Sequence, residues 1–167
     1  MKSRALLVIG VLLASLLSGC SKQQAHGVVS SSDSMLIEPG VSIGPVHSGM
    51  TMKQVIAKLG EPVKVRDGIL MYRNLSVFLA QDGLVGHVFY FEPSTNRPFT
   101  EVITAHTKEG IGIGSSRDEV ISAYGEPTAT KYENVHKENE VLVYEPLHLQ
   151  FHIRNGRVYL IAVYFKK

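Results

Sequence analysis

Cysteine and tryptophan are almost absent from this chain of 167 residues, which has one cysteine and no tryptophan. A single cysteine excludes an internal disulfide framework and any zinc or iron–sulfur site that needs several thiolates. The chain also has little excess of either positive or negative charge, because its formal net charge is only +2. Lys2 and Arg4 supply that excess, so the rest of the chain carries 15 basic and 15 acidic residues. Such a balance gives no electrostatic reason to expect nucleic acid as a partner.

Motifs of common catalytic, nucleotide and metal sites are missing too. The sequence has no Gly-x-Ser-x-Gly turn and no His-Glu-x-x-His helix, and glycines 110, 112 and 114 lack the spacing of a dinucleotide loop. His148 and His152 would lie ~13 Å apart along one strand, too far to share an ion. His136 lies in an acidic stretch where chelation is possible but nothing requires it. We therefore expect no catalytic residue, no cofactor and no metal site.

The first twenty residues have the pattern of an export signal. Lys2 and Arg4 precede an apolar run of 13 residues, Ala5 to Leu17, which is too short to span a bilayer comfortably. The run ends in Leu-Ser-Gly followed by Cys20. This order resembles the lipobox of bacterial lipoproteins. The resemblance implies that residues 1–19 are removed and that acyl chains such as palmitate are attached at Cys20. The alternative is an ordinary secretory leader with an incidental cysteine.

Residues 20–40 are predicted to form a flexible tether. The stretch is polar and rich in serine, and it cannot bury enough apolar surface to offset the entropy lost on ordering. Several acyl chains would make a stable membrane anchor. Ser21 follows the cysteine, and in Gram-negative lipoproteins this implies the outer membrane, facing the periplasm.

The remainder of the chain contains two similar stretches. Residues 49–62 match residues 114–127 at an offset of 65, and residues 78–91 match residues 151–164 at an offset of 73. The second copy thus has eight extra residues, most simply placed between Tyr132 and Glu140. The pattern predicts two tandem repeats joined by a linker. The tether, first repeat, linker and second repeat are expected at 20–40, 41–92, 93–99 and 100–167.

Each copy begins with the signals of a short helix. Thr51 and Ser116 are good N-cap residues, and a glutamine or glutamate stands three residues after each of them. Apolar residues then recur at helical spacing. A Gly-Glu-Pro sequence ends each helix, which predicts a left-handed conformation for Gly60 and Gly125. The two helices are expected at 51–59 and 116–124.

Each copy then closes with a β-hairpin. Asp82-Gly83 and Asn155-Gly156 are signals of two-residue turns. Residues 147–154 alternate between apolar and polar, so this strand is expected to have one buried and one free face. Residues 158–165 are apolar on both faces, as in a central strand. We therefore expect an α+β fold with helices on one face of a continuous antiparallel sheet.

A glycine turn, a short helix ending in Gly-x-Pro and a hairpin together resemble known folds. The pattern is similar to the helix-plus-sheet repeat of β-lactamase inhibitory protein and to the SmpA/OmlA (BamE) family of small outer-membrane lipoproteins. The two copies show it in Gly49, Val55, Leu59, Gly60 and Pro62, and in Gly114, Val120, Tyr124, Gly125 and Pro127. These residues specify a fold, so the resemblance carries over no functional residue.

The expected function is that of a non-catalytic, lipid-anchored envelope lipoprotein that binds a protein, as a scaffold, assembly factor or inhibitor. The alternative is a periplasmic carrier of small molecules or an enzyme with an unrecognised site. The polar face of the sheet is the candidate binding surface, because the helices should cover the other face. Its expected residues are His148, Gln150, His152, Arg154 and Tyr159. A merely solvated sheet face is the simpler alternative.

Overall fold

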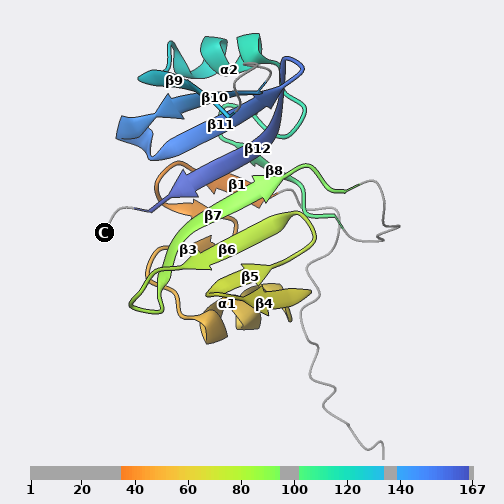
Figure 1. Ribbon diagram of the computed structural model, residues 1–167, viewed down its shortest axis with the longest axis vertical. Helices are drawn as coiled ribbons and strands as arrows, with labels where there is room; N and C mark the ends of the chain where they lie inside the picture. The colour runs from red at the N-terminus through yellow and green to blue at the C-terminus, as the bar shows by residue number, and fades with distance from the viewer. Residues whose placement is uncertain (1–34, 95–101, 134–138, 166–167) are drawn as a thin grey trace, which may run out of the picture.

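The computed structural model describes residues 35–94, 102–133 and 139–165, which form two helices and two sheets (Figure 1). Cys20, the leader, most of the predicted tether, part of the predicted linker and five of the extra residues of the second copy lie outside the described residues. Within the described ranges, no helix has the length and apolar character needed to cross a membrane. The fold class is α+β, as the sequence predicts.

The larger sheet has eight antiparallel strands in the order β4-β5-β6-β7-β12-β11-β10-β9. Its strands are β4 (Lys64–Arg66), β5 (Ile69–Met71), β6 (Leu75–Leu79), β7 (Val85–Phe91), β9 (Ala129–Tyr132), β10 (Asn139–Tyr144), β11 (Leu149–Arg154) and β12 (Arg157–Tyr164). Figure 1 shows this order from β4 at the bottom to β9 near the top. The predicted central strand is confirmed, since β12 pairs with β7 in the middle and buries Ile161, Ala162 and Val163 in succession.

A second sheet of four short strands was not predicted. It contains β1 (Met35–Glu38), β2 (Ser42–Ile43), β3 (Val46–His47) and β8 (Ala105–Thr107), in the order β3-β2-β1-β8. The pairing of β1 with β8 is parallel. The sequence predicts a tether that extends to residue 40, but the structure has β1 at Met35–Glu38, with Ile37 fully buried between Ile43 and Thr107. The sequence Glu-Val-Ile-Thr-Ala-His-Thr at 101–107 predicts a strand, but the structure assigns only Ala105–Thr107 to β8, and Glu101 lies outside the described residues.

The two helices begin where their caps predict. They are α1 (Met52–Leu59) and α2 (Arg117–Tyr124). In both, the cap hydroxyl accepts from the backbone N–H three residues later, and that residue's side chain accepts from the cap N–H. The Gln54 side chain accepts at 2.8 Å from Thr51, and Glu119 accepts at 2.6 Å from Ser116. These reciprocal bonds satisfy donors that a helix N-terminus otherwise leaves unpaired.

The core lies between one face of the eight-stranded sheet, the two helices and the small sheet. Val55 of α1, Val120 of α2 and Ile37 of β1 are fully buried in the same cluster as Phe151 and Ile161 of the large sheet. We call this covered face the inner face and the opposite one the outer face. The helices and the small sheet therefore all pack on the inner face.

The predicted helix ends are partly wrong. Gly60 and Gly125 have positive φ angles of 80° and 75°, but their ψ angles of −175° and −168° are extended rather than left-handed α. Glu61 and Glu126, which follow these glycines, each precede a proline, and a residue in that position is disfavoured in the α conformation, so the helix cannot continue. The carbonyl of Gly60 accepts from the Tyr72 hydroxyl, and that of Gly125 from the Tyr144 hydroxyl. This region of φ and ψ is accessible essentially to glycine alone.

The two hairpin turns differ. Asn155 and Gly156 have φ angles of 51° and 72° between the paired Arg154 and Arg157, which confirms a two-residue turn. The first hairpin instead has a three-residue loop, 81–83. Its ends are closed by the Ala80 N–H, which donates to the Leu84 carbonyl at 2.7 Å. The Asp82 carboxylate accepts from the Leu84 N–H, which stabilises the longer loop.

Candidate functional site

The outer face of the large sheet is formed by residues that alternate with the core residues. On β7 and β12 these are His87, Phe89, Phe91, Leu160, Ala162 and Tyr164. On β6 they include Ser76 and Phe78, and on β11 Gln150, His152 and Arg154. Their strand neighbours Val88, Phe151 and Ile161 belong to the core. Most of these outer-face residues are partly buried rather than fully exposed.

Three of the five predicted binding residues lie on this face as expected. Gln150, His152 and Arg154 alternate with the buried Leu149, Phe151 and Ile153 along β11. Tyr159 occupies a β-bulge in β12, opposite the step between His152 and Ile153. A bulge turns a side chain out of the regular alternation. Tyr159 is thereby brought beside His152 and Arg154.

His148 is the exception, and its predicted place in the strand is wrong. Glu145–Leu147 form a 3₁₀ turn with a proline in its first positions, and His148 ends it with a left-handed φ of 52°. Its carbonyl accepts from the Tyr164 N–H at 2.9 Å. The proline starts a turn where the alternation suggested a strand, so β11 begins only at Leu149.

The carboxylate of Glu133, just after β9, joins the predicted residues in one cluster. It accepts from the Tyr159 hydroxyl at 2.5 Å and from the Asn139 amide at 3.2 Å, and it lies 2.6 Å from Nδ1 of His152. Burial alone would raise the pKa of Glu133, but the hydrogen bonds from Tyr159 and His152 lower it below its usual value. Burial and the neighbouring Glu133 carboxylate raise the pKa of Tyr159. The Tyr159 hydroxyl therefore stays protonated at neutral pH and acts as a hydrogen-bond donor to Glu133.

Arg154 extends this cluster. Its guanidinium donates to the Glu92 carboxylate at 2.7 Å and lies 4.5 Å from the centre of the Tyr159 ring. Nε2 of His152 is buried and has no hydrogen-bond partner within the described residues. The corner formed by His152, Arg154 and Tyr159 is thus held mainly by internal contacts. These contacts hold the three side chains in defined positions.

An aromatic cluster at the centre of the outer face was missed by the sequence analysis. The His87 ring stacks on Phe78 at 4.4 Å and on Tyr164 at 5.4 Å between centroids. Phe89 lies 4.6 Å from Phe78, at an angle to it. We call these four residues the aromatic stack. Burial lowers the pKa of His87 and raises that of Tyr164, so both side chains are uncharged at neutral pH.

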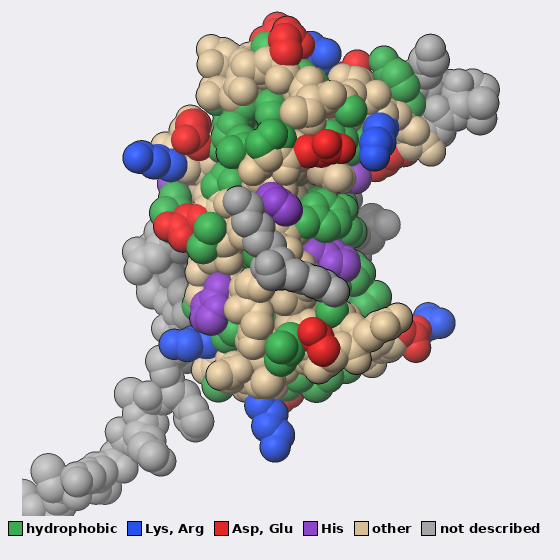
Figure 2. Space-filling model, turned by 90° about the vertical axis from the view of Figure 1, so that its left-hand side faces the viewer, with side chains coloured by type: hydrophobic (Ala, Val, Ile, Leu, Met, Phe, Trp, Pro, Cys, Tyr) green, Lys and Arg blue, Asp and Glu red, His purple; other side chains and the backbone are tan. Residues whose placement is uncertain are grey.

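Histidine side chains gather in the middle of another side of the molecule, with most charged side chains nearer its periphery (Figure 2). In residues 35–94, 102–133 and 139–165, however, no three His, Cys, Asp or Glu side chains are grouped so that they could hold a metal ion. The rings of His47 and His106 instead lie 3.0 Å from the backbone carbonyls of Ser48 and Thr107.

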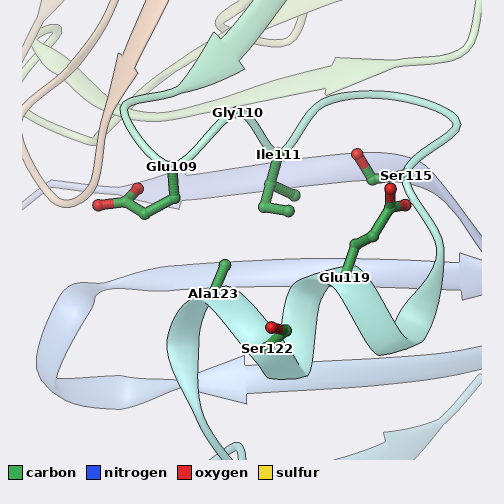
Figure 3. A pocket seen from close by; sticks show the side chains of 7 residues that line it. All are labelled: Glu109, Gly110, Ile111, Ser115, Glu119, Ser122 and Ala123. Atoms are coloured by element: carbon green, nitrogen blue, oxygen red, sulfur yellow. The ribbon is translucent and has the colours of Figure 1, made fainter.

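A hollow of about 350 Å³ lies between α2 and the loop that follows β8 (Figure 3). Its lining residues are Glu109, Gly110, Ile111, Ser115, Glu119, Ser122 and Ala123. Both carboxylates are already engaged, because Glu119 closes the α2 capping box and Glu109 accepts from the Tyr124 hydroxyl at 2.6 Å. The hydrogen bond from Tyr124 lowers the pKa of Glu109. The hollow therefore presents neither a nucleophile with its base nor an apolar pocket.

No protein-family model matches the sequence, and no curated protein matches it. Two solved structures show a distant similarity. One is a DUF4309 family protein (YjgB) from Bacillus subtilis, with a TM-score of 0.47 and 15% identity over 70% of this chain and 78% of that one. The other is an extracellular protein containing a SCP domain from Bacillus anthracis, with a TM-score of 0.45 and 9% identity. It is matched over 92% of this chain and 50% of its own, so this chain spans half its length.

Proposed function

We propose that this protein is a non-catalytic, lipid-anchored protein of the bacterial envelope that binds another protein through the outer face of its large sheet. The observation that carries this proposal is the aromatic stack, which lies at the centre of a face that the helices and the small sheet leave uncovered. Aromatic and arginine side chains are the residue types that dominate protein interfaces. Arg154 and Tyr159 add such groups at one edge of the face.

The anchoring part of the proposal rests on the leader. Its basic start, apolar run and Leu-Ser-Gly-Cys sequence resemble a lipobox, and Cys20 is the chain's one cysteine. Residues 21–34 separate it from β1, and a chain of that length can reach at most ~50 Å. The folded body would then lie close to the membrane surface, on its periplasmic side if the cell is Gram-negative.

We further propose that the two halves are tandem repeats. Equivalent backbone bonds support this: the Gly49 N–H donates to Val85, and the Gly114 N–H donates to Val158, as the two sequence offsets require. Each helix is also followed by four strands of the large sheet, and the two sets of strands meet at the β7–β12 pair. This arrangement places the junction of the halves, and with it the aromatic stack, at the centre of the outer face.

The alternative of a small-molecule carrier or enzyme has no comparable support. The hollow beside α2 is lined by carboxylates that already have hydrogen-bond partners. A carrier site is usually apolar, with a few unengaged polar groups that orient the ligand. In the part of the chain that the structure describes, the outer face is therefore the better candidate.

A crosslinking experiment tests the proposal. Full-length wild-type protein is crosslinked in intact cells, purified and analysed for covalently bound proteins. Phe89→Ser removes the centre of the aromatic stack from the outer face, and Lys53→Ala with Lys58→Ala changes two exposed residues of α1. At equal protein levels, we expect Phe89→Ser to lose a specific partner that the α1 variant keeps. Loss confined to the α1 variant would assign binding to the helix side and contradict the proposal.

A further inference from the structure

The strand residues that carry charge on the outer face are all cationic in the described part of the chain. The register of the large sheet places Lys64, Arg66, Lys131, Arg154 and Arg157 on this face. Three carboxylates lie nearby: Asp67 pairs with Arg66, Glu92 pairs with Arg154, and Glu133 is engaged by His152 and Tyr159. The Arg157 guanidinium donates to the Gly114 carbonyl at 2.8 Å. Lys64 and Lys131 have no ion-pair partner within the described residues. The face therefore presents positive charge that its own residues leave uncompensated.

These two lysines lie at opposite ends of the sheet, equally far from its centre. Lys64 is on the edge strand β4, three strands from β7, and Lys131 is on the edge strand β9, three strands from β12. At ~4.8 Å between neighbouring strands, each lysine is ~14 Å from the β7–β12 pair. Between them the register places no lysine or arginine: one row runs from Lys64 over Ser76 to Phe89, and the next row runs from Phe91 over His152 to Lys131. The Glu133 carboxylate lies beside His152 and is engaged by it and by Tyr159.

We propose that the outer face binds an extended acidic segment of the partner protein that lies across the strands. An apolar side chain of the segment packs on the aromatic stack, and a carboxylate on each side of it pairs with Lys64 or Lys131. An extended chain advances ~3.4 Å per residue, so each carboxylate stands about four residues from the apolar one. This inference rests on the proposed function and adds to it the chemistry of the bound segment.

The pattern of charge favours a peptide over a polyanion. A nucleic acid or an anionic membrane presents negative charge continuously, and its binding surfaces carry basic residues along the whole contact. The centre of this face holds stacked rings instead, with an uncharged histidine among them. Two separated cations on either side of an apolar centre fit a segment whose charges are equally far apart.

The test uses a displayed library of random peptides of about twelve residues, the length needed to cross the eight strands. The library is selected on the wild-type protein, and recovered peptides are synthesised and measured by calorimetry. We expect aspartate and glutamate to be enriched about four residues on either side of an aromatic or aliphatic residue. Binding should weaken by about tenfold in Lys64→Glu with Lys131→Glu, and it should weaken with added salt.

Lys53→Glu with Lys58→Glu is the matched control, because it makes the same charge change on exposed residues of α1. This variant should bind the peptides like the wild type, and circular dichroism must show that both variants are folded. Peptides without acidic enrichment, no recovered peptides, equal binding by the outer-face variant, or binding to vesicles of anionic phospholipid in preference to the peptides would each overturn the inference. If the crosslinked partner depends on Phe89 but not on the two lysines, the proposed function stands and this inference fails.

Discussion

Asn74 is the polar side chain whose loss should weaken the fold most. It is fully buried and lies immediately before β6. Its side-chain NH₂ donates to the Ile103 carbonyl at 2.7 Å, and its side-chain oxygen accepts from the Ile103 N–H at 3.2 Å. The amide thus pairs with both backbone groups of one residue, as a neighbouring strand would. Through this contact the large sheet holds the segment that leads into β8.

Replacing Asn74 with alanine removes both bonds and leaves the backbone groups of Ile103 in a partly buried place. Each buried polar group without a partner costs ~1–3 kcal/mol, but the Ile103 carbonyl keeps a bond of 3.3 Å from the Tyr90 hydroxyl. We therefore expect Asn74→Ala to lower the free energy of unfolding by about 2–4 kcal/mol.

Urea denaturation at neutral pH, followed by circular dichroism, measures this loss, and an unchanged m-value shows that the folded state stays compact. Asn139→Ala is the control, since its single bond to Glu133 is exposed and should cost less than about 1 kcal/mol. A change of under about 0.5 kcal/mol for Asn74→Ala would refute the reasoning, because it would mean that water replaces the amide at Ile103.

Three further predictions follow from single residues. Gly125→Ala should destabilise by about 1–3 kcal/mol, and Gly125→Asn should not recover the loss in thermal unfolding, because Asn tolerates left-handed α but not this extended ψ. Burial lowers the pKa of His87 in the folded protein, so as pH falls the unfolded chain binds a proton at this residue before the folded one does. The free energy of unfolding of the wild type should therefore decline as pH falls below the usual histidine pKa. In His87→Gln, urea titrations across that range should show a weaker dependence of this free energy on pH. Cys20→Ala should abolish acylation and membrane association, which mass spectrometry and cell fractionation detect; wild-type protein that is soluble and carries no acyl chain would contradict the lipobox assignment.

The helices were predictable because their signals are local. The capping boxes at Thr51 and Ser116 need only residues within one turn, and both helices begin as expected. The strand β1 was not predictable from local signals, because one of its two neighbours in the sheet is the parallel strand β8, which lies some 70 residues later. The prediction that His148 lies in the strand was wrong for a different reason, because Pro146 starts a turn inside a stretch that alternates like a strand.

The candidate site was predicted only at its edge. Along β11, strict alternation separates His152 and Arg154 from buried neighbours, so the free face can be recognised from sequence. Along β7 and β12 both faces are apolar, so the alternation of apolar and polar residues that marks a free face is missing, and the sequence does not show which rings face outward. Glu133 lies outside any strand, and its contacts with His152 and Tyr159 depend on how β9 pairs with β10 and β10 with β11. No local pattern can show such an arrangement.

The contacts of Glu133 also decide which substitution can test binding. Replacing His152 or Tyr159 removes a partner of a partly buried carboxylate, so lost binding could result from a disturbed corner rather than from a lost contact. Phe89 has aromatic neighbours and no polar group that its removal would leave without a partner. Lys64 and Lys131 are exposed, and neither forms an ion pair with the residues that the structure describes. Substitutions at these three positions change the outer face with the least change to the fold, so a loss of binding there reports on the face itself.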